Sequence, residues 1–265
     1  MSRTVSSLTN PTVKAVRALH LRKTREASGL FLAEGLKIVA EAVDLGRAPR
    51  TLMFAPEAAD HPVLRRCVEA TQADGGEVIE VTRDILEKVS RRDNPQTVVA
   101  VFEQRFTPLS ELNPRLAGCW VALHRVRDPG NLGTVIRTAD AAGAGGVVLV
   151  GECVDPFSVE AVRATMGSVF AVPIARAGEA EFLAWRRVWP GSVVGTLLSA
   201  EIDYRAADYR APTLILMGNE QAGLTPELAS ACDVNVKIPM RGRADSLNLS
   251  VATGIMIYAV SERAV

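Results

Sequence analysis

The residues that bind metals or form disulfides are few in this chain of 265 residues. It contains three histidines and four cysteines, and the cysteines are scattered: Cys67, Cys119, Cys153 and Cys232. No CxxC pair or neighbouring histidine gives the close ligand spacing of a structural zinc site, so no metal site is predicted. Four cysteines leave disulfide pairing open by number, but a domain of this size does not need it.

Long apolar runs are also missing. No uninterrupted run approaches about 18 residues, the length of a membrane-spanning helix. Residues 1–10 are polar, and no apolar segment of a secretory signal follows them. We therefore expect no membrane span and a location in the reducing cytoplasm.

A net charge of one sign is absent as well. The chain carries 30 basic and 30 acidic residues, which weakly disfavours a nucleic-acid partner. The distribution is uneven, because six basic residues precede the first acidic one, Glu26: Arg3, Lys14, Arg17, Arg22, Lys23 and Arg25. This segment is either a solvated helix face or a patch that contacts phosphates.

Alternating helix and strand patterns divide the chain into two parts. The apolar content of 48% is enough for a core, and the length allows one large domain or two modest ones. In the first part we predict helices at 12–26, 36–45, 63–72 and 83–89, and strands at 30–33, 51–55, 78–81 and 98–102. Residues 107–118 contain two prolines and lack periodicity, which is typical of a linker. The predicted boundaries are a domain at 1–106, a linker at 107–118 and a domain at 119–265.

The second part has short apolar runs that are typical of a parallel sheet covered on both faces. We predict strands at 120–123, 147–150, 193–196, 214–217 and 234–238, and helices at 132–142, 159–163, 180–185 and 226–231. The last helix, 247–260, is apolar on most sides, so we expect it to be buried or to lie at a subunit interface.

Three polar clusters that contain glycine adjoin these elements, at 128–139, 217–220 and 238–250. Ligands of open α/β sheets bind beyond the carboxyl ends of strands, and Gly218 directly follows one. Three such loops predict one composite pocket, and so an enzyme. A fourth cluster, 141–146, is rich in glycine but follows a helix and precedes a strand. A dinucleotide site needs the reverse order, which argues against a nucleotide-dependent oxidoreductase.

Some residues of these clusters have simpler structural interpretations. Asn131 is predicted to cap the helix 132–142, and Ser246 to cap the last helix. Arg137 lies off the apolar stripe of its helix. It is either a surface arginine paired with Asp140 or a guanidinium that binds a phosphate or carboxylate.

Together the three clusters resemble the signature motifs of SpoU-type (TrmH-like) RNA ribose 2′-O-methyltransferases of the SPOUT superfamily. The matching residues are Asp128-Pro129-x-Asn131-x-Gly133-x-x-x-Arg137-Thr138-Ala139, Gly218-Asn219-Glu220-x-x-Gly223-Leu224, and Ile238-Pro239-Met240-x-Gly242 with Ser246-Leu247-Asn248-x-Ser250. Asn10-Pro11-x-Val13-Lys14 and residues 29–35 are similar to the family's ribosomal-protein-like RNA-binding domain. The resemblance covers nearly the whole chain.

The resemblance implies a small N-terminal α/β RNA-binding domain and a C-terminal α/β trefoil-knot (SPOUT) methyltransferase domain. It also implies a homodimer that binds S-adenosyl-L-methionine at the positions of Thr196, Gly218, Ile238 and Leu247. The implied catalytic residues are Asn131, Arg137, Glu220, Ser246 and Asn248, with Arg137 in the leading role. Guanidinium groups keep their proton in proteins, so clamping the target phosphate suits Arg137 better than acting as a base. Lys14, Arg17, Arg22, Lys23 and Arg25 of the basic segment would then contact RNA.

The expected activity is transfer of a methyl group to a ribose 2′-hydroxyl. Large-subunit rRNA is the favoured substrate, because the N-terminal part resembles that of the rRNA-modifying members. A tRNA substrate and a non-catalytic RNA-binding protein on the same fold remain alternatives.

Overall fold

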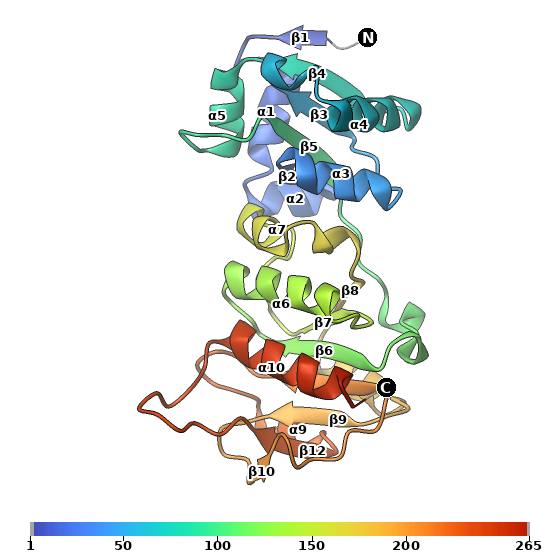
Figure 1. Cartoon of the computed structure of the whole chain (residues 1–265), viewed down its shortest axis with the longest axis vertical. Coiled ribbons are helices and arrows are strands. Elements are labelled where there is room, and N and C mark those ends of the chain that lie inside the picture. Colours follow the sequence, from blue (N-terminus) through green and yellow to red (C-terminus); the bar gives the residue numbers. More distant parts are fainter. Residues whose placement is uncertain (1–2, 264–265) are drawn as a thin grey trace. The chain divides into compact units, whose positions relative to one another are not determined.

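The computed structural model describes residues 3–263 and contains two compact units (Figure 1). The first unit extends to Gln104 and also includes Asp155–Phe170, a segment that the predicted boundaries assign to the second domain. The second unit comprises Arg105–Val154 and the chain from Ala171 onward. The predicted linker contains two short 3-10 turns, Leu109–Glu111 and Pro114–Leu116.

In the first unit, a sheet has the strand order β1-β4-β3-β5-β2. Its strands are β1 (Arg3–Val5), β2 (Leu30–Glu34), β3 (Thr51–Phe54), β4 (Glu77–Val81) and β5 (Val98–Glu103). Its helices are α1 (Pro11–Ala18), α2 (Arg22–Ser28), α3 (Leu36–Asp44), α4 (Pro62–Ala73), α5 (Arg83–Ser90) and α7 (Val159–Thr165). Strands β1, β3 and β4 run parallel, whereas β5 is antiparallel to both of its neighbours. The sequence missed β1, a three-residue strand on the sheet edge.

The prediction of one helix over 12–26 was wrong, because the chain breaks between α1 and α2. Leu21 is extended, with φ −87° and ψ 127°. The side chain of Arg25 reaches back from α2 and donates to the backbone oxygens of Leu19 (2.8 Å) and His20 (3.0 Å). It thereby satisfies carbonyls that a continuous helix would have bonded internally.

Arg25 has a structural role, and the prediction that it contacts RNA was wrong. The residue is 4% exposed, and its Nε lies 2.8 Å from Oδ2 of the buried Asp155. A guanidinium held this way inside the unit cannot reach an RNA phosphate.

We predict that Arg25→Ala lowers the free energy of unfolding by about 3–5 kcal/mol, because the buried carboxylate of Asp155 would lose the guanidinium that lies 2.8 Å from it. Urea denaturation measures this loss. Arg22→Ala is the matched control: Arg22 pairs with Glu26 on the exposed side of the same helix, and its loss should cost less than about 1 kcal/mol. Similar losses for the two variants would contradict the structural role of Arg25.

In the second unit, a parallel sheet has the strand order β10-β12-β9-β11-β6-β7-β8. The strands are β6 (Cys119–His124), β7 (Val147–Val150), β8 (Ile174–Ala177), β9 (Val193–Thr196), β10 (Ile202–Asp203), β11 (Thr213–Met217) and β12 (Val234–Lys237). Its helices are α6 (Pro129–Ala141), α8 (Glu179–Arg186), α9 (Pro226–Ser230) and α10 (Leu249–Ser261). Because every pair is parallel, all the loops that leave the carboxyl ends lie along one edge.

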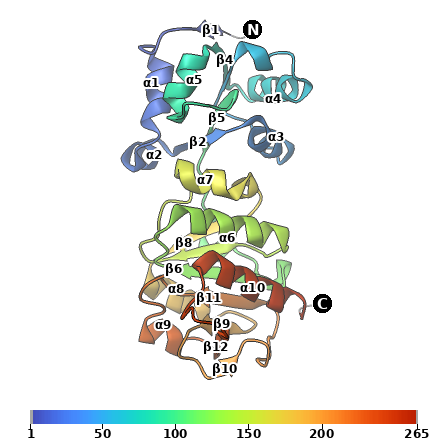
Figure 2. The same ribbon diagram turned by 60° about the vertical axis from the view of Figure 1, so that its left-hand side comes forward.

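Burial and close packing explain several local sequence features of this unit. Strands β6 and β11 are buried along their whole length, as the continuous apolar runs predicted. Gly145 and Gly146 serve packing, because a Cβ would lie 2.2 Å and 2.8 Å, respectively, from the ring of Trp120, whereas Gly143 has a φ of 66° just after the end of α6. The last helix, α10, packs against α6, β6 and β11 (Figure 2).

In residues 3–263 the four cysteines are free, and none of these residues form a cluster of His, Cys, Asp or Glu that could hold a metal ion. Among the described helices, none is both long and apolar enough to cross a membrane.

Candidate active site

The first cluster begins helix α6, but with a different cap from the predicted one. Asp128 is the N-cap, and its Oδ1 accepts from the backbone N of Asn131 at 2.6 Å, with Pro129 in the first turn. Proline suits the first turn because it lacks an N–H that would need a partner there. The side chain of Asn131 is therefore not used as a cap, and it is available for other contacts.

Asn131 joins the three sequence clusters through hydrogen bonds. Its Oδ1 accepts from Nδ2 of Asn248 at 2.8 Å, and its Nδ2 donates to Oε1 of Glu220 at 3.4 Å. Asn131 lies 89 residues before Glu220 and 117 residues before Asn248 in the sequence, and the structure brings the three into one network. This is the composite arrangement that the three loops predicted.

Asn248 is also the residue that begins helix α10. Its Oδ1 accepts from the backbone N of Ser250 at 2.9 Å, from Oγ of Ser250 at 2.7 Å and from the backbone N of Val251 at 3.3 Å. The prediction that Ser246 is the cap was wrong, because the helix starts at Leu249. Oγ of Ser246 instead contacts the carboxylate of Asp245 at 3.1 Å.

The second cluster is a tight turn after β11. Asn219 and Gly223 exchange backbone hydrogen bonds of 3.0 and 2.9 Å, and Oδ1 of Asn219 accepts from the backbone N of Gln221 and Ala222. A Cβ on Gly218 would lie 2.2 Å from the carbonyl carbon of Gly223, so the turn can close only with glycine there.

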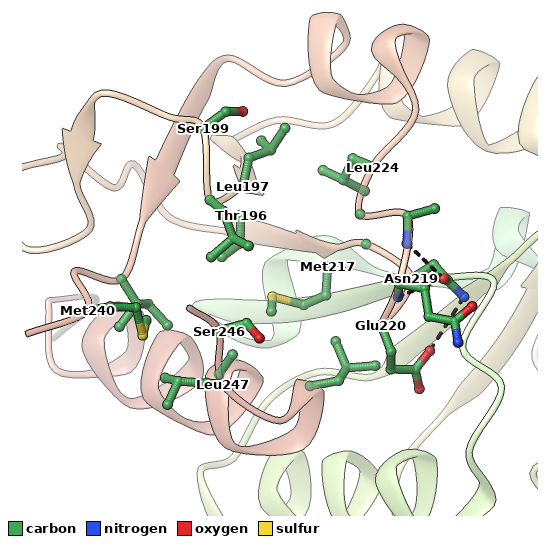
Figure 3. Close-up of a pocket in the computed structure, with 18 residues that line it drawn as sticks. Thr196, Leu197, Ser199, Met217, Asn219, Glu220, Leu224, Met240, Ser246 and Leu247 are labelled. Atoms are coloured by element: carbon green, nitrogen blue, oxygen red, sulfur yellow. Dashed lines mark hydrogen bonds between the residues drawn. The ribbon is translucent and has the colours of Figure 1, made fainter. Parts of the chain in front are cut away.

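A cavity of about 370 Å³ lies between these loops. In Figure 3, Thr196 and Met217 face Ser246 and Leu247 across it, with Asn219 and Glu220 at one end. The residues that line it are Thr196, Leu197, Leu198, Ser199, Met217, Gly218, Asn219, Glu220, Gln221, Ala222, Gly223, Leu224, Ile238, Met240, Ser246, Leu247, Leu249 and Ala252. All four residues predicted to bind the cofactor are among them, together with Glu220 and Ser246.

The lining suits an organic ligand that is mostly apolar with a few polar groups. Leu197, Met217, Ile238 and Leu247 supply apolar walls. Oγ1 of Thr196 is buried and has no hydrogen-bond partner within the part of the chain that the structure describes. Because buried hydroxyls are nearly always bonded, this atom is a free polar contact for a ligand.

Arg137 lies apart from this cavity. It is exposed on α6 and is not among the lining residues, and its side chain forms no ion pair or hydrogen bond with any residue between 3 and 263. The alternative in which it pairs with Asp140 is therefore wrong. Of the five predicted catalytic residues, the structure brings together Asn131, Glu220 and Asn248, places Ser246 on the cavity wall, and leaves Arg137 outside.

Comparison with known proteins agrees with this site. The model of the SpoU rRNA Methylase family matches residues 118–258, and that of an MRM3-like substrate binding domain matches residues 10–100. The chain belongs to the SpoU rRNA methylase family. The resemblance drawn from the three clusters is thus confirmed, and the protein is a SpoU-type RNA methyltransferase.

Relatives resemble the chain over nearly its full length. The 23S rRNA (uridine(2479)-2′-O)-methyltransferase of Streptomyces viridochromogenes is 34% identical over 250 residues, which cover 91% of this chain and 86% of the relative. The 23S rRNA (guanosine(2553)-2′-O)-methyltransferase RlmP of Bacillus subtilis is 30% identical, with 96% and 97% covered. The AdoMet-bound rRNA methyltransferase of Sinorhizobium meliloti is 52% identical with a TM-score of 0.93, and the match covers 99% of this chain and 98% of that one.

Sequence reasoning missed two residues that shape this site. Asn219 belongs to the second cluster, but its residue type alone did not predict that its side chain folds the turn. Its Nδ2 also donates to the backbone oxygen of Arg125 at 2.8 Å. Arg125 gave no signal at all, because the contact uses its backbone.

Proposed function

We propose that the protein transfers the methyl group of S-adenosyl-L-methionine to a ribose 2′-hydroxyl of large-subunit rRNA. The observation that carries this proposal is that the second and third clusters line one cavity, and that Asn131 of the first cluster is hydrogen-bonded to Glu220 and Asn248 of the other two. The names of the relatives support both the reaction and the choice of rRNA. An rRNA substrate would also place the activity in the cytoplasm.

In this proposal Thr196, Gly218, Ile238 and Leu247 hold the cofactor. Their apolar walls would enclose its rings, and the free Oγ1 of Thr196 would bond one polar atom. When bound, the cofactor would supply an activated methyl group, because its positively charged sulfonium sulfur can leave as a neutral thioether.

The residues of the network would act on the RNA. Asn131 and Asn248 hold one another at 2.8 Å, which fixes the amide of Asn131 beside Glu220 for contact with the ribose. The guanidinium of Arg137 would clamp the target phosphate and polarise the 2′-hydroxyl. Since a guanidinium keeps its own proton, the hydroxyl proton would pass to water as the bond between the oxygen and the methyl group forms.

We also propose a homodimer in which Arg137 reaches the cavity of the partner subunit. Arg137 is exposed on α6 and has no partner among the described residues. The helix that packs on α6, α10, exposes Val251 (51%) and Tyr258 (49%), two apolar side chains seven positions apart on one face. A second copy of the chain would cover this face and bring in the missing cation.

The first unit is proposed to bind the RNA through one basic face on α1, α2 and the end of α5. Among residues 3–104 and 155–170, six cations have side chains that form no ion pair or hydrogen bond: Lys14, Arg17, Lys23, Lys88, Arg91 and Arg92. All six lie on or next to these helices, and α1 packs against α5. The other cations of the unit have partners, including Arg22 with Glu26. Cations whose charge is not already neutralised by a carboxylate can pair with the phosphates of an RNA backbone.

We predict that Arg17→Glu, Arg91→Glu and Arg92→Glu together weaken RNA binding. The slope of log affinity against log salt should fall by about 2 in magnitude, because contacts to phosphate release counterions. Filter binding at several salt concentrations gives the slope. The control reverses the charges of Lys37 and Arg65. These exposed cations lie on other helices of the unit, and each is paired with a carboxylate. Equal slopes for the two charge reversals would reduce the basic face to ordinary surface.

Two alternatives are separated by direct assays. Calorimetric titration with S-adenosyl-L-methionine should give heat of binding, whereas a non-catalytic RNA-binding protein would give none. Tritiated methyl groups should enter 23S rRNA from a strain that lacks the protein, and not rRNA that already carries the modification. Label in tRNA alone would replace the rRNA proposal with a tRNA one.

A further inference from the structure

A second group of charged residues is connected to the cofactor cavity through the Asn219 turn. It contains His124 at the end of β6, Arg125 directly after it, and Glu179 in the first turn of α8. None of these lines the cavity. They are connected to it through the backbone of Arg125.

Arg125 has an unusual backbone. Its φ is 50°, a left-handed conformation that residues other than glycine rarely adopt without support. In this conformation its carbonyl oxygen accepts from Nδ2 of Asn219 at 2.8 Å. That bond ties the turn after β11 to the loop after β6, and the turn forms one wall of the cavity (Figure 3).

The side chain of Arg125 is held by Glu179. Nη2 of Arg125 lies 2.6 Å from Oε1 of Glu179, and Nε2 of His124 lies 3.1 Å from the same oxygen. The hydrogen bond from His124, together with the charge of Arg125, lowers the pKa of Glu179, so its carboxylate stays ionised. Gly151 makes room for the pair, because a Cβ there would lie 3.2 Å from Cγ of Arg125 and 3.4 Å from Oε1 of Glu179.

We infer that Glu179 is a positioning residue for the cofactor turn, acting through Arg125 and Asn219. Glu179 stabilises the left-handed backbone of Arg125, that backbone presents its carbonyl to Asn219, and Asn219 holds the turn closed. The side chain of Arg125 is half exposed, so this ion pair adds little to overall stability. Its effect should appear in the shape of the cavity, and so in cofactor affinity. The inference rests on the proposed function, since it takes the cavity to bind S-adenosyl-L-methionine.

The test is calorimetric titration of the full-length protein with S-adenosyl-L-methionine. Glu179→Gln keeps the size of the side chain but removes its charge, and it should raise Kd about five- to tenfold. The kcat at saturating cofactor should change less than about twofold, because a high concentration of cofactor fills the cavity and so shifts the turn back to its closed conformation. Glu152→Gln is the matched control. Glu152 follows β7 and lines the same surface depression as Arg125 and Glu179, but its side chain forms no hydrogen bond or ion pair with any described residue. It should bind like the wild type.

A second background separates positioning from general stability. Arg125→Gly adopts the left-handed conformation without strain and has no side chain for Glu179 to hold. Glu179→Gln should therefore have almost no further effect on Kd in the Arg125→Gly protein. An equal loss of affinity in both backgrounds, or wild-type affinity for Glu179→Gln alone, would overturn the inference. Absence of binding by the wild-type protein would overturn the proposed function itself.

Discussion

Arg137→Ala is expected to reduce methyl transfer by at least about a thousandfold while the Kd for S-adenosyl-L-methionine changes less than about twofold. Arg137 is outside the cavity that holds the cofactor residues, so its removal should leave that cavity intact. The same residue is the exposed cation on α6 that the proposal assigns to the target phosphate. Single-turnover transfer assays and calorimetric titration measure the two quantities separately.

Arg137→Lys is the control for charge alone. A lysine keeps the positive charge but loses the bidentate geometry with which a guanidinium binds phosphate, so partial activity is expected. Near wild-type turnover by Arg137→Ala would remove this residue from the mechanism. Equal activity of the alanine and lysine variants would show that its charge is irrelevant.

Gly218→Ala has the second large expected effect, a loss of cofactor affinity of about a hundredfold or more. The added Cβ would lie 2.2 Å from the carbonyl carbon of Gly223 and 2.4 Å from the backbone N of Leu224. Both are backbone atoms of the turn, which can relieve the clash only by opening, and the cavity would lose one wall. Titration with S-adenosyl-L-methionine measures the loss.

Gly242→Ala is the matched control for this substitution. Gly242 belongs to the third cluster, but a Cβ on it meets nothing within 4 Å. The Kd of Gly242→Ala for S-adenosyl-L-methionine should remain within about twofold of the wild-type value. If Gly218→Ala bound the cofactor as tightly as Gly242→Ala does, the turn would not form the cofactor site.

Mixing the two variants tests whether Arg137 acts across a dimer. Neither Arg137→Ala nor Gly218→Ala should be active alone. In a mixed dimer, the intact cavity of the first chain meets the intact Arg137 of the second, so random mixing should restore about a quarter of the wild-type activity. If Arg137 served its own chain, no mixture would recover activity.

The sequence was sufficient to predict that the three clusters come together, because their polar and glycine residues are concentrated in local motifs. Gly218 and the residues around Asn131 and Asn248 are recognisable from spacing and type alone, and the structure joins them. Buried strands such as β6 and β11 were also predictable, because a continuous apolar run has few other uses. Strand β8 was not predicted, since its sequence, Ile174 to Ala177, has only four residues and includes an arginine.

The sequence could not predict which hydrogen-bond or ion-pair partner a residue finds when that partner is distant in the chain or competes with a neighbouring residue. Arg25 looks like its basic neighbours, yet it is buried because Asp155, 130 residues away, arrives beside it. Asn131 and Ser246 have good capping residue types, but Asp128 and Asn248 reach the free N–H groups instead. Arg125 acts through its backbone, so its side chain carries no sign of its contact with Asn219.

The most direct measurement of the central claim is the position of the transferred methyl group. Purified protein, tritiated S-adenosyl-L-methionine and 23S rRNA from a strain that lacks the protein are combined, and the RNA is then hydrolysed in alkali. Alkaline cleavage requires a free 2′-hydroxyl, so ribose methylation protects the adjoining phosphodiester. The account predicts tritium in alkali-resistant dinucleotides, whereas tritium in mononucleotides would place the methyl group on a base and contradict it.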